Sequence, residues 1–249
     1  MRGFRTIFGR ELAGLFLSPL AWILLCATFV YDAFFFLYAL EQGTGGEVNG
    51  ALYYMHEGPF WLLVVFLPPL LTMRMISEES RSGMLEFLLT APVGDASVVA
   101  GKALAATAFM ALAAAVLPLF GVLVGLLGAT PDWGQLVAQW IGAVLVSCLF
   151  CSLGIFSSAA SGTPLVAAFL AILANIVLVF LPMLAPFLAR GRLREPVEWT
   201  LDKLAIQAHF RGSFLTGALD SAHVVFFLSW ILALLFLSVR VVETKRWLV

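Results

Sequence analysis

The sequence predicts an all-α membrane protein, and three observations support this fold class. Of the 249 residues, 62% are hydrophobic and only 12% are charged, whereas soluble domains carry about 25% charged residues. The mean hydropathy is +1.02. Long stretches carry no charge and are continuously apolar, without the period-two alternation of a β-barrel strand, and a helix needs about 20 such residues to cross the hydrocarbon core.

The uncharged stretches predict six transmembrane helices within a single domain, 1–249. The longest stretch, 133–189, holds two of them, because small polar residues at 157–163 end one helix and Pro164 suits the first turn of the next. The six predicted spans are 19–40, 58–76, 102–128, 135–156, 164–188 and 221–241.

The basic residues predict the orientation, since they accumulate on the cytoplasmic side. The loop 41–57 after the first span has acids and no base, which places it outside. Both termini are then cytoplasmic, with basic residues at Arg2, Arg5, Arg10, Arg240, Lys245 and Arg246. One segment disagrees: the predicted outer connection, 189–220, carries five of the fourteen basic residues, interleaved with acids.

Residues 1–18 predict an N-terminal helix that lies in the membrane interface. Its apolar residues recur at three- and four-residue steps, and Ser18-Pro19 lets the chain turn into the bilayer. The alternative is that the segment is only the basic flank of the first span. The residues on the apolar face are Phe4, Ile7, Phe8, Leu12, Leu15 and Phe16.

A charged segment, 74–102, separates the second span from the third. Its polar and turn-forming residues include Glu78, Glu79, Arg81 and Gly83. It continues as the amphipathic stretch 84–89 and is stopped by Pro92, which lacks an amide donor and disfavours helix before it. This pattern predicts a short helix at the membrane surface, where a partner protein could push on it.

Polar residues inside the predicted spans are rare. Asp32 in the first span lines a translocation path, contacts a neighbouring helix, or lies near the outer headgroups if the span starts early. Asn175 in the fifth span forms a hydrogen bond between helices or contacts substrate. The Cys148-x-x-Cys151 pair favours helix packing over a metal or redox site.

Recognisable catalytic motifs are absent from the sequence. There is no phosphate-binding loop, no zinc-type spacing and no nucleophile elbow. We therefore expect no catalytic residue, no metal site and no ATP hydrolysis on this chain. The scattered histidines His56, His209 and His223 fit ordinary polar or interfacial positions.

The segment 79–93, ESRSGMLEFLLTAPV, followed by Gly101-Lys102, resembles the E-x-x-x-G-T-L-E-x-L-L-T-x-P-V…G-K signature of ABC-2 type transporter permeases. Met84 stands where that signature has Thr. The C-terminal region 210–247 is similar to the gliding-motility-associated branch of the family, with the copper-enzyme maturation permeases as close relatives. The resemblance covers essentially the whole chain.

The resemblance implies a permease subunit of an ATP-driven transporter in the bacterial cytoplasmic (inner) membrane, which we expect to be an exporter of an unidentified substrate. It also implies a second permease copy in a homodimer, and two copies of a separate ATPase that hold ATP and Mg. An auxiliary periplasmic or membrane subunit is a further expected partner besides membrane lipid, whereas nucleic acid is not, and no cofactor is expected on this chain.

The resemblance makes the segment 77–100 a cytoplasmic coupling helix that contacts the ATPase. The coupling residues it implies are Glu78, Glu79, Arg81, Gly83, Met84, Leu85, Glu86, Leu88, Leu89 and Pro92. The alternative function is a membrane scaffold, which transmits ATPase-driven conformational change to an assembly or motility complex without translocating a substrate.

Overall fold

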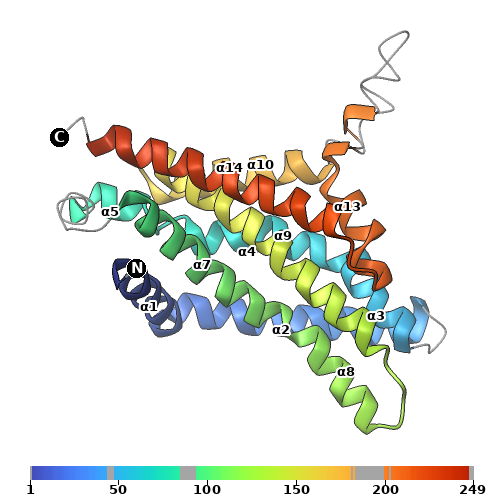
Figure 1. Cartoon of the computed structure of the whole chain (residues 1–249). Helices are drawn as coiled ribbons and strands as arrows, with labels where there is room; N and C mark the ends of the chain where they lie inside the picture. Colours follow the sequence, from blue (N-terminus) through green and yellow to red (C-terminus); the bar gives the residue numbers. More distant parts are fainter. Residues whose placement is uncertain are drawn as a thin grey trace.

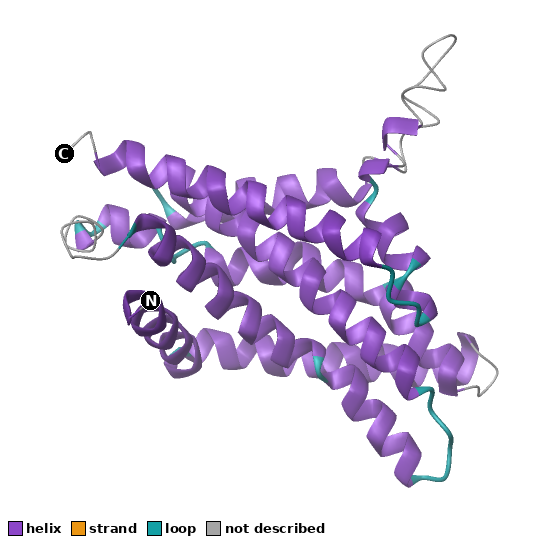
Figure 2. Cartoon of the chain, viewed as in Figure 1, coloured by secondary structure: helices purple, strands orange, loops and turns teal. Residues whose placement is uncertain are grey.

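The computed structural model describes residues 2–43, 48–84, 94–180, 182, 199–201 and 203–246. The long helices in these ranges extend roughly along one common axis, and α1 (Arg2–Leu17) lies across one end of the bundle (Figure 1). Every regular element in the described ranges is a helix (Figure 2). The predicted all-α class is therefore confirmed.

Five helical stretches of the described chain are long and apolar enough to cross a membrane. They are Pro19–Glu41, Pro59–Arg81, Asp95–Leu126, Trp133–Ala160 and Ser221–Lys245. The principal helices within them are α2 (Pro19–Tyr38), α4 (Pro59–Thr72), α7 (Asp95–Ala114) with α8 (Val116–Leu126), α9 (Trp133–Ala160) and α14 (Ser221–Arg246). These stretches correspond to five of the six predicted spans.

The fifth predicted span, 164–188, corresponds to α10 (Pro164–Phe180), which is apolar but shorter. Apart from Pro182, the rest of that span lies outside the described residues. Helix α10 packs against α4 and α9. Helix α7 begins at Asp95, earlier than the predicted start of the third span at 102, because Val98 and Val99 are already buried.

Short elements close both ends of the bundle. The π-helix η1 (Ala39–Gly43), α3 (Val48–Glu57), α13 (Ile206–Gly212) and the 3₁₀ turn η4 (Phe214–Thr216) lie at one end, and α5 (Ser77–Arg81) lies at the other. Arg211 on α13 lies 3.8 Å from the carboxylate of Glu57 on α3. The end with α3 and α13 is called the capped end below, and the end with α1 and α5 is called the charged end.

Prolines in α4 explain the contact made by Asn175. Pro69 has no N–H, so the carbonyl of Val65 loses its normal partner one helical turn later. The Asn175 Nδ2 atom on α10 donates to that carbonyl at 3.0 Å, and its side chain is fully buried. This bond is interhelical, the first of the two roles expected of Asn175.

The third long stretch is interrupted near its middle. Pro118 cannot donate to the carbonyl of Ala114, and the Ala115 amide bonds back to Leu112 at 3.1 Å in a tighter turn. The carbonyl of Ala111 instead accepts from Trp140 Nε1 at 3.2 Å. Helix α8 therefore leaves the line of α7, as Figure 1 shows.

The three cysteines are free, and Cys26 is exposed. Cys151 is fully buried in an apolar cluster that also contains Phe109 and Ile155, while Cys148 is partly exposed. In the described part of the chain, no group of three or more His, Cys, Asp or Glu could hold a metal ion.

Candidate coupling site

Four charged side chains join three helices at the charged end. Lys102 on α7 has its Nζ atom 3.0 Å from Glu11 Oε1 on α1 and 2.9 Å from Glu79 Oε1 on α5. Arg10 reaches the same two carboxylates, at 2.6 Å and 2.9 Å respectively. This set, Arg10, Glu11, Glu79 and Lys102, is called the ion cluster below.

Burial makes the ion cluster different from an exposed salt bridge. The Lys102 side chain is 0% exposed, and those of Glu11 and Glu79 are 16% and 18% exposed. A charge removed from water in this way is costly unless its partners stay in place. Removing any one charge of the ion cluster takes an opposite charge away from a largely buried partner, so the cluster holds α1, α5 and α7 together.

The neighbouring charges of the ion cluster also determine the protonation of Glu11 and Arg10. Burial alone would raise the pKa of the Glu11 carboxyl, but the Lys102 ammonium and the Arg10 guanidinium outweigh it and hold that pKa below its ordinary value. The hydrogen bond to Glu11 raises the pKa of the Arg10 guanidinium. Glu11 is therefore a carboxylate at neutral pH, as the ion cluster requires.

Gly101 allows α1 to approach α7 closely. A methyl group at this position would lie only 3.0 Å from Cγ2 of Ile7 and 3.4 Å from the backbone nitrogen of Phe8. Ile7 is 5% exposed, so it has little room to move. The Gly101-Lys102 pair thus gives the N-terminal helix both a packing surface and an ionic partner.

The turn between α4 and α5 is held by α9. The Ser158 hydroxyl accepts from the backbone N–H groups of Ile76 and Ser77 at 3.1 and 3.0 Å, and it donates to the carbonyl of Met73 at 3.0 Å. Helix α14 adds a further contact, since Lys245 Nζ lies 3.3 Å from Ser80 Oγ. Helix α5 is therefore fixed to α9 and α14 as well as to the ion cluster.

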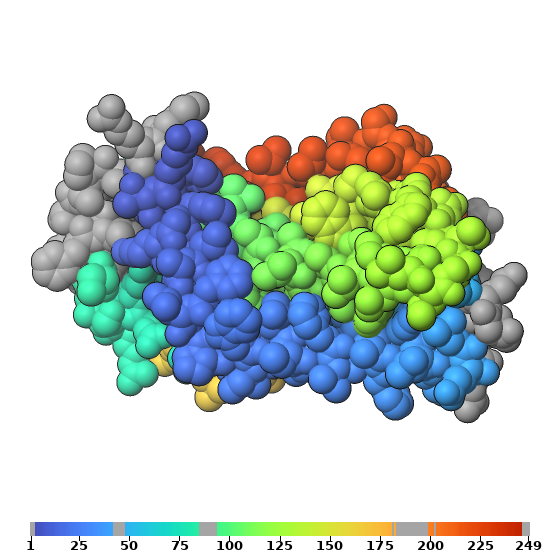
Figure 3. Space-filling model, turned by 90° about the horizontal axis from the view of Figure 1, so that it is seen from below, coloured from blue at the N-terminus to red at the C-terminus, as the bar shows by residue number. Residues whose placement is uncertain are grey.

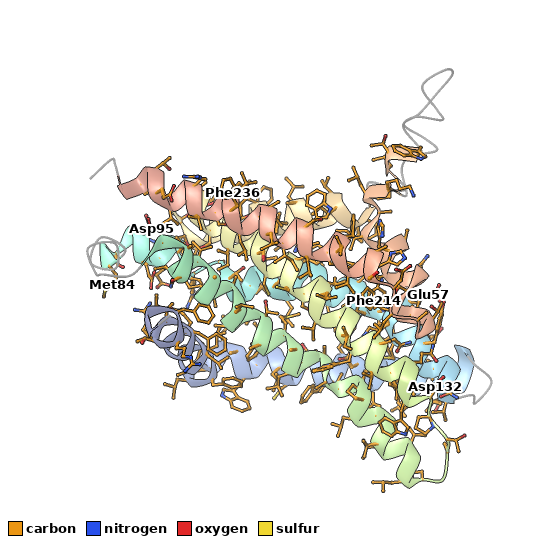
Figure 4. The ribbon with its side chains drawn as sticks, viewed as in Figure 1. Glu57, Met84, Asp95, Asp132, Phe214 and Phe236 are labelled. Carbon is orange, nitrogen blue, oxygen red and sulfur yellow. The ribbon has the colours of Figure 1, made fainter. Side chains whose placement is uncertain are left out.

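The other side of α5 is open. Glu78, Arg81 and Met84 are exposed. Gly83 has a φ of +74°, a backbone conformation that residues other than glycine rarely adopt. Figure 4 shows Met84 and Asp95 together at this end, with Glu57 and Asp132 at the opposite one. A groove of about 270 Å³ borders α5, with walls from α1, α2 and α4.

The space-filling view shows α1 lying across the charged end beside the surface of α2 and α7 (Figure 3). Its position across the bundle fits the predicted interfacial helix. Among the sequence-predicted coupling residues, Glu79 turns inward to the ion cluster and Glu78 and Arg81 are exposed on α5, while Gly83 and Met84 follow the end of that helix. Leu85, Glu86, Leu88, Leu89 and Pro92 lie outside the described residues.

Sequence reasoning did not select Arg10, Glu11, Lys102 or Ser158 as members of this site. A signal for Lys102 was available, because a lysine followed by an uncharged stretch must find a carboxylate if its helix continues inward. Nothing in the sequence singles out Ser158 from the serines around it.

Replacing Ser158 with Ala is expected to destabilise the chain by about 2 kcal/mol, because two buried N–H groups lose their acceptor. The apparent melting temperature in detergent, followed by tryptophan fluorescence, should fall. Ser229→Ala is the matched control, because the exposed Ser229 hydroxyl bonds only within its own helix, to Phe226 at 2.7 Å. Equal melting temperatures for the two variants would contradict the assigned role of Ser158.

Apolar helices, a helix lying across one end and a buried ion cluster at that end define a multi-pass membrane protein. The sequence profile of the ABC-2 family transporter proteins matches residues 17–193, which is more than half of the chain. The chain belongs to this family, and it is therefore a membrane component of an ABC transporter, a class that is generally not itself catalytic. No curated protein sequence matches the chain.

Proposed function

We propose that the chain is the permease subunit of an ATP-driven exporter in the bacterial inner membrane. It works as a homodimer with two copies of a separate ATPase, which hold ATP and Mg. The family supports an ATPase partner in general. The observation that carries the finer proposal is the junction of α1, α5 and α7 at the ion cluster, because it connects an exposed surface helix to a long apolar helix.

The exposed face of α5 is the proposed ATPase contact. Glu78 and Arg81 offer both signs of charge there, and Gly83 has a positive φ just after the helix ends. Glu79 takes a different role from its exposed neighbours: it passes a displacement of α5 to Lys102 on α7. A buried ionic contact suits this role because it cannot lengthen without exposing an unpaired charge.

The arrangement of the ends supports six spans. Helix α1 and the end of α14 both contact α5, through the Arg10–Glu79 pair and the Lys245–Ser80 pair. Because α1 and the end of α14 lie on one side, the helices between them cross an even number of times. Helix α10 is therefore the sixth crossing, in addition to the five long stretches. The basic residues at this charged end favour the cytoplasmic side.

A charge reversal on α5 tests the ATPase contact. Arg81→Glu is expected to lower recovery of the ATPase with the affinity-tagged permease from native membranes at least about tenfold, because loss of one charge pair and a new repulsion cost more than 1.4 kcal/mol. The matched control is Arg211→Glu at the capped end, which should leave ATPase recovery unchanged. Undiminished recovery with Arg81→Glu would refute the proposed contact.

Transport is distinguished from the scaffold function by inverted membrane vesicles that contain the native complex. An exporter accumulates one or more cellular compounds in the vesicle lumen on addition of ATP, as measured by mass spectrometry of the vesicle contents. Vesicles whose contents do not change with ATP, although the ATPase is bound and active, would favour the scaffold.

A further inference from the structure

A small cavity lies within the bundle, away from the ion cluster. Its volume is about 30 Å³, and its walls come from α2, α3, α4, α7, α8 and α9. Most of the lining is apolar, including Phe60, Leu67 and Met110. The polar lining residues are Thr28, Asp32, His56 and Ser147.

The polar side chains in this cavity are buried and incompletely paired. Asp32 is 6% exposed, His56 is 4% exposed and Ser147 is fully buried. His56 Nδ1 and Ser147 Oγ have no hydrogen-bond partner. A buried polar group without a partner destabilises a fold, so these atoms point to an occupant that supplies hydrogen bonds.

Water has the right size for this occupant. A cavity needs about 10–15 Å³ of this kind of volume to hold one water molecule, so the space takes about two. The Asp32 carboxyl, His56 Nδ1 and Ser147 Oγ supply the polar partners that a buried water requires. Thr28 contributes less, because its hydroxyl already donates to the carbonyl of Leu24 at 2.8 Å.

We propose that this cavity is an internal proton-binding site, in which Asp32 takes up and releases a proton through water held by His56 and Ser147. On uptake, a water-borne hydronium ion transfers its proton to a carboxylate oxygen of Asp32 and leaves as water. Release is the reverse transfer, so one O–H bond breaks as another forms. No other reactant is needed.

The surroundings favour a proton over a metal ion. The lining offers one carboxylate and one imidazole, fewer strong ligands than a metal site needs. A single proton bound by Asp32 leaves both groups neutral in this buried site, whereas the same proton on His56 would create a carboxylate and an imidazolium that both lose hydration.

Other ionisable groups near the site are engaged elsewhere. Tyr31 precedes Asp32, and its hydroxyl donates to the carbonyl of Pro59 at 3.1 Å. Glu57 follows His56, is 42% exposed and lies 3.8 Å from Arg211. The walls from α4, α7, α8 and α9 contribute no charged residue. Asp32 and His56 are thus the titratable groups that face the cavity among the described residues.

The test is infrared difference spectroscopy of the full chain in lipid nanodiscs as the pH is changed, in H₂O and D₂O. We expect the band of a carboxyl group shielded from bulk water, which grows as the pH falls and shifts in D₂O. Asp32→Asn should abolish this band. Asp132→Asn is the matched control and should keep it, because Asp132 caps α9 through Gln135 N at 3.1 Å and asparagine caps equally well.

His56→Gln and Ser147→Ala test the water-mediated part, and both should shift the midpoint of the titration. Because these two variants keep the carboxyl group, they remain informative if Asp32→Asn fails to fold. The proposal is overturned if the native chain shows no such band or if the band survives in Asp32→Asn. It is also overturned if neither His56→Gln nor Ser147→Ala shifts the midpoint of the titration. A band abolished by sodium chloride but not by choline chloride at constant pH would assign the site to a metal cation instead.

Discussion

Lys102→Met is expected to destabilise the protein by about 3–5 kcal/mol, the range seen when one partner of a buried ion pair is removed. Methionine fills a similar space, so the loss comes from the charges. Glu11 and Glu79 would then share only Arg10. Water cannot replace the lost ammonium fully, because these side chains are only 16% and 18% exposed. Thermal unfolding in lipid nanodiscs, followed by tryptophan fluorescence, measures the effect.

The double variant Lys102→Met with Glu79→Gln should recover part of this loss, because Arg10 then has a single carboxylate, that of Glu11, to compensate. Arg74→Ala is the control for an exposed pair: Arg74 lies 3.9 Å from Glu78 and both are more than half exposed. Its expected effect is below about 1 kcal/mol. If Lys102→Met were as mild as Arg74→Ala, the ion cluster would not be what holds α1 and α5 to α7.

Phe210→Ala is expected to cost about 3–5 kcal/mol, the range for truncating a buried phenylalanine. Phe210 is fully buried in α13. Its ring centroid lies 5.7 Å from that of Phe60, 5.6 Å from Trp61 and 6.0 Å from Phe214. The substitution removes the aromatic contact between α13 and α4, so thermal unfolding should begin at a lower temperature.

Phe169→Ala is the control for Phe210→Ala, because Phe169 is 66% exposed on α10 and truncating it opens no internal cavity. Limited proteolysis adds a local measurement. If α13 is loosened, the chain should be cleaved faster near α13, at the capped end, in Phe210→Ala and not in Phe169→Ala. Similar melting and cleavage for both variants would show that α13 does not depend on this ring.

The helical class and most of the spans could be predicted from sequence. In lipid, a continuously apolar stretch satisfies its backbone hydrogen bonds within itself only as a helix. The divided stretch 133–189 shows this well: small polar residues and Pro164 predicted the boundary between α9 and α10. The break between α7 and α8 was not predicted, although Pro118 was visible, because prolines are tolerated within many membrane helices.

The direction in which Glu79 faces could not be predicted. Its neighbours Glu78 and Arg81 are also charged, and local periodicity over so short a helix does not identify the buried side. The answer depends on Lys102 and on Arg10, which lies 69 positions away in sequence. Asp32 was recognised as unusual for a span, but whether it lines one cavity with His56 depends on how α2 and α3 pack.

The interruption at Ala115 has a consequence for how the third span moves. Its inner segment, α7, is bound to α1 through Gly101 and the ion cluster, whereas α8 departs from that axis. We therefore expect a tilt imposed at the charged end to be carried rigidly only as far as this discontinuity. The two halves of this stretch are then expected to act as separate levers, so that movement of α7 at the charged end is uncoupled from the far end of α8.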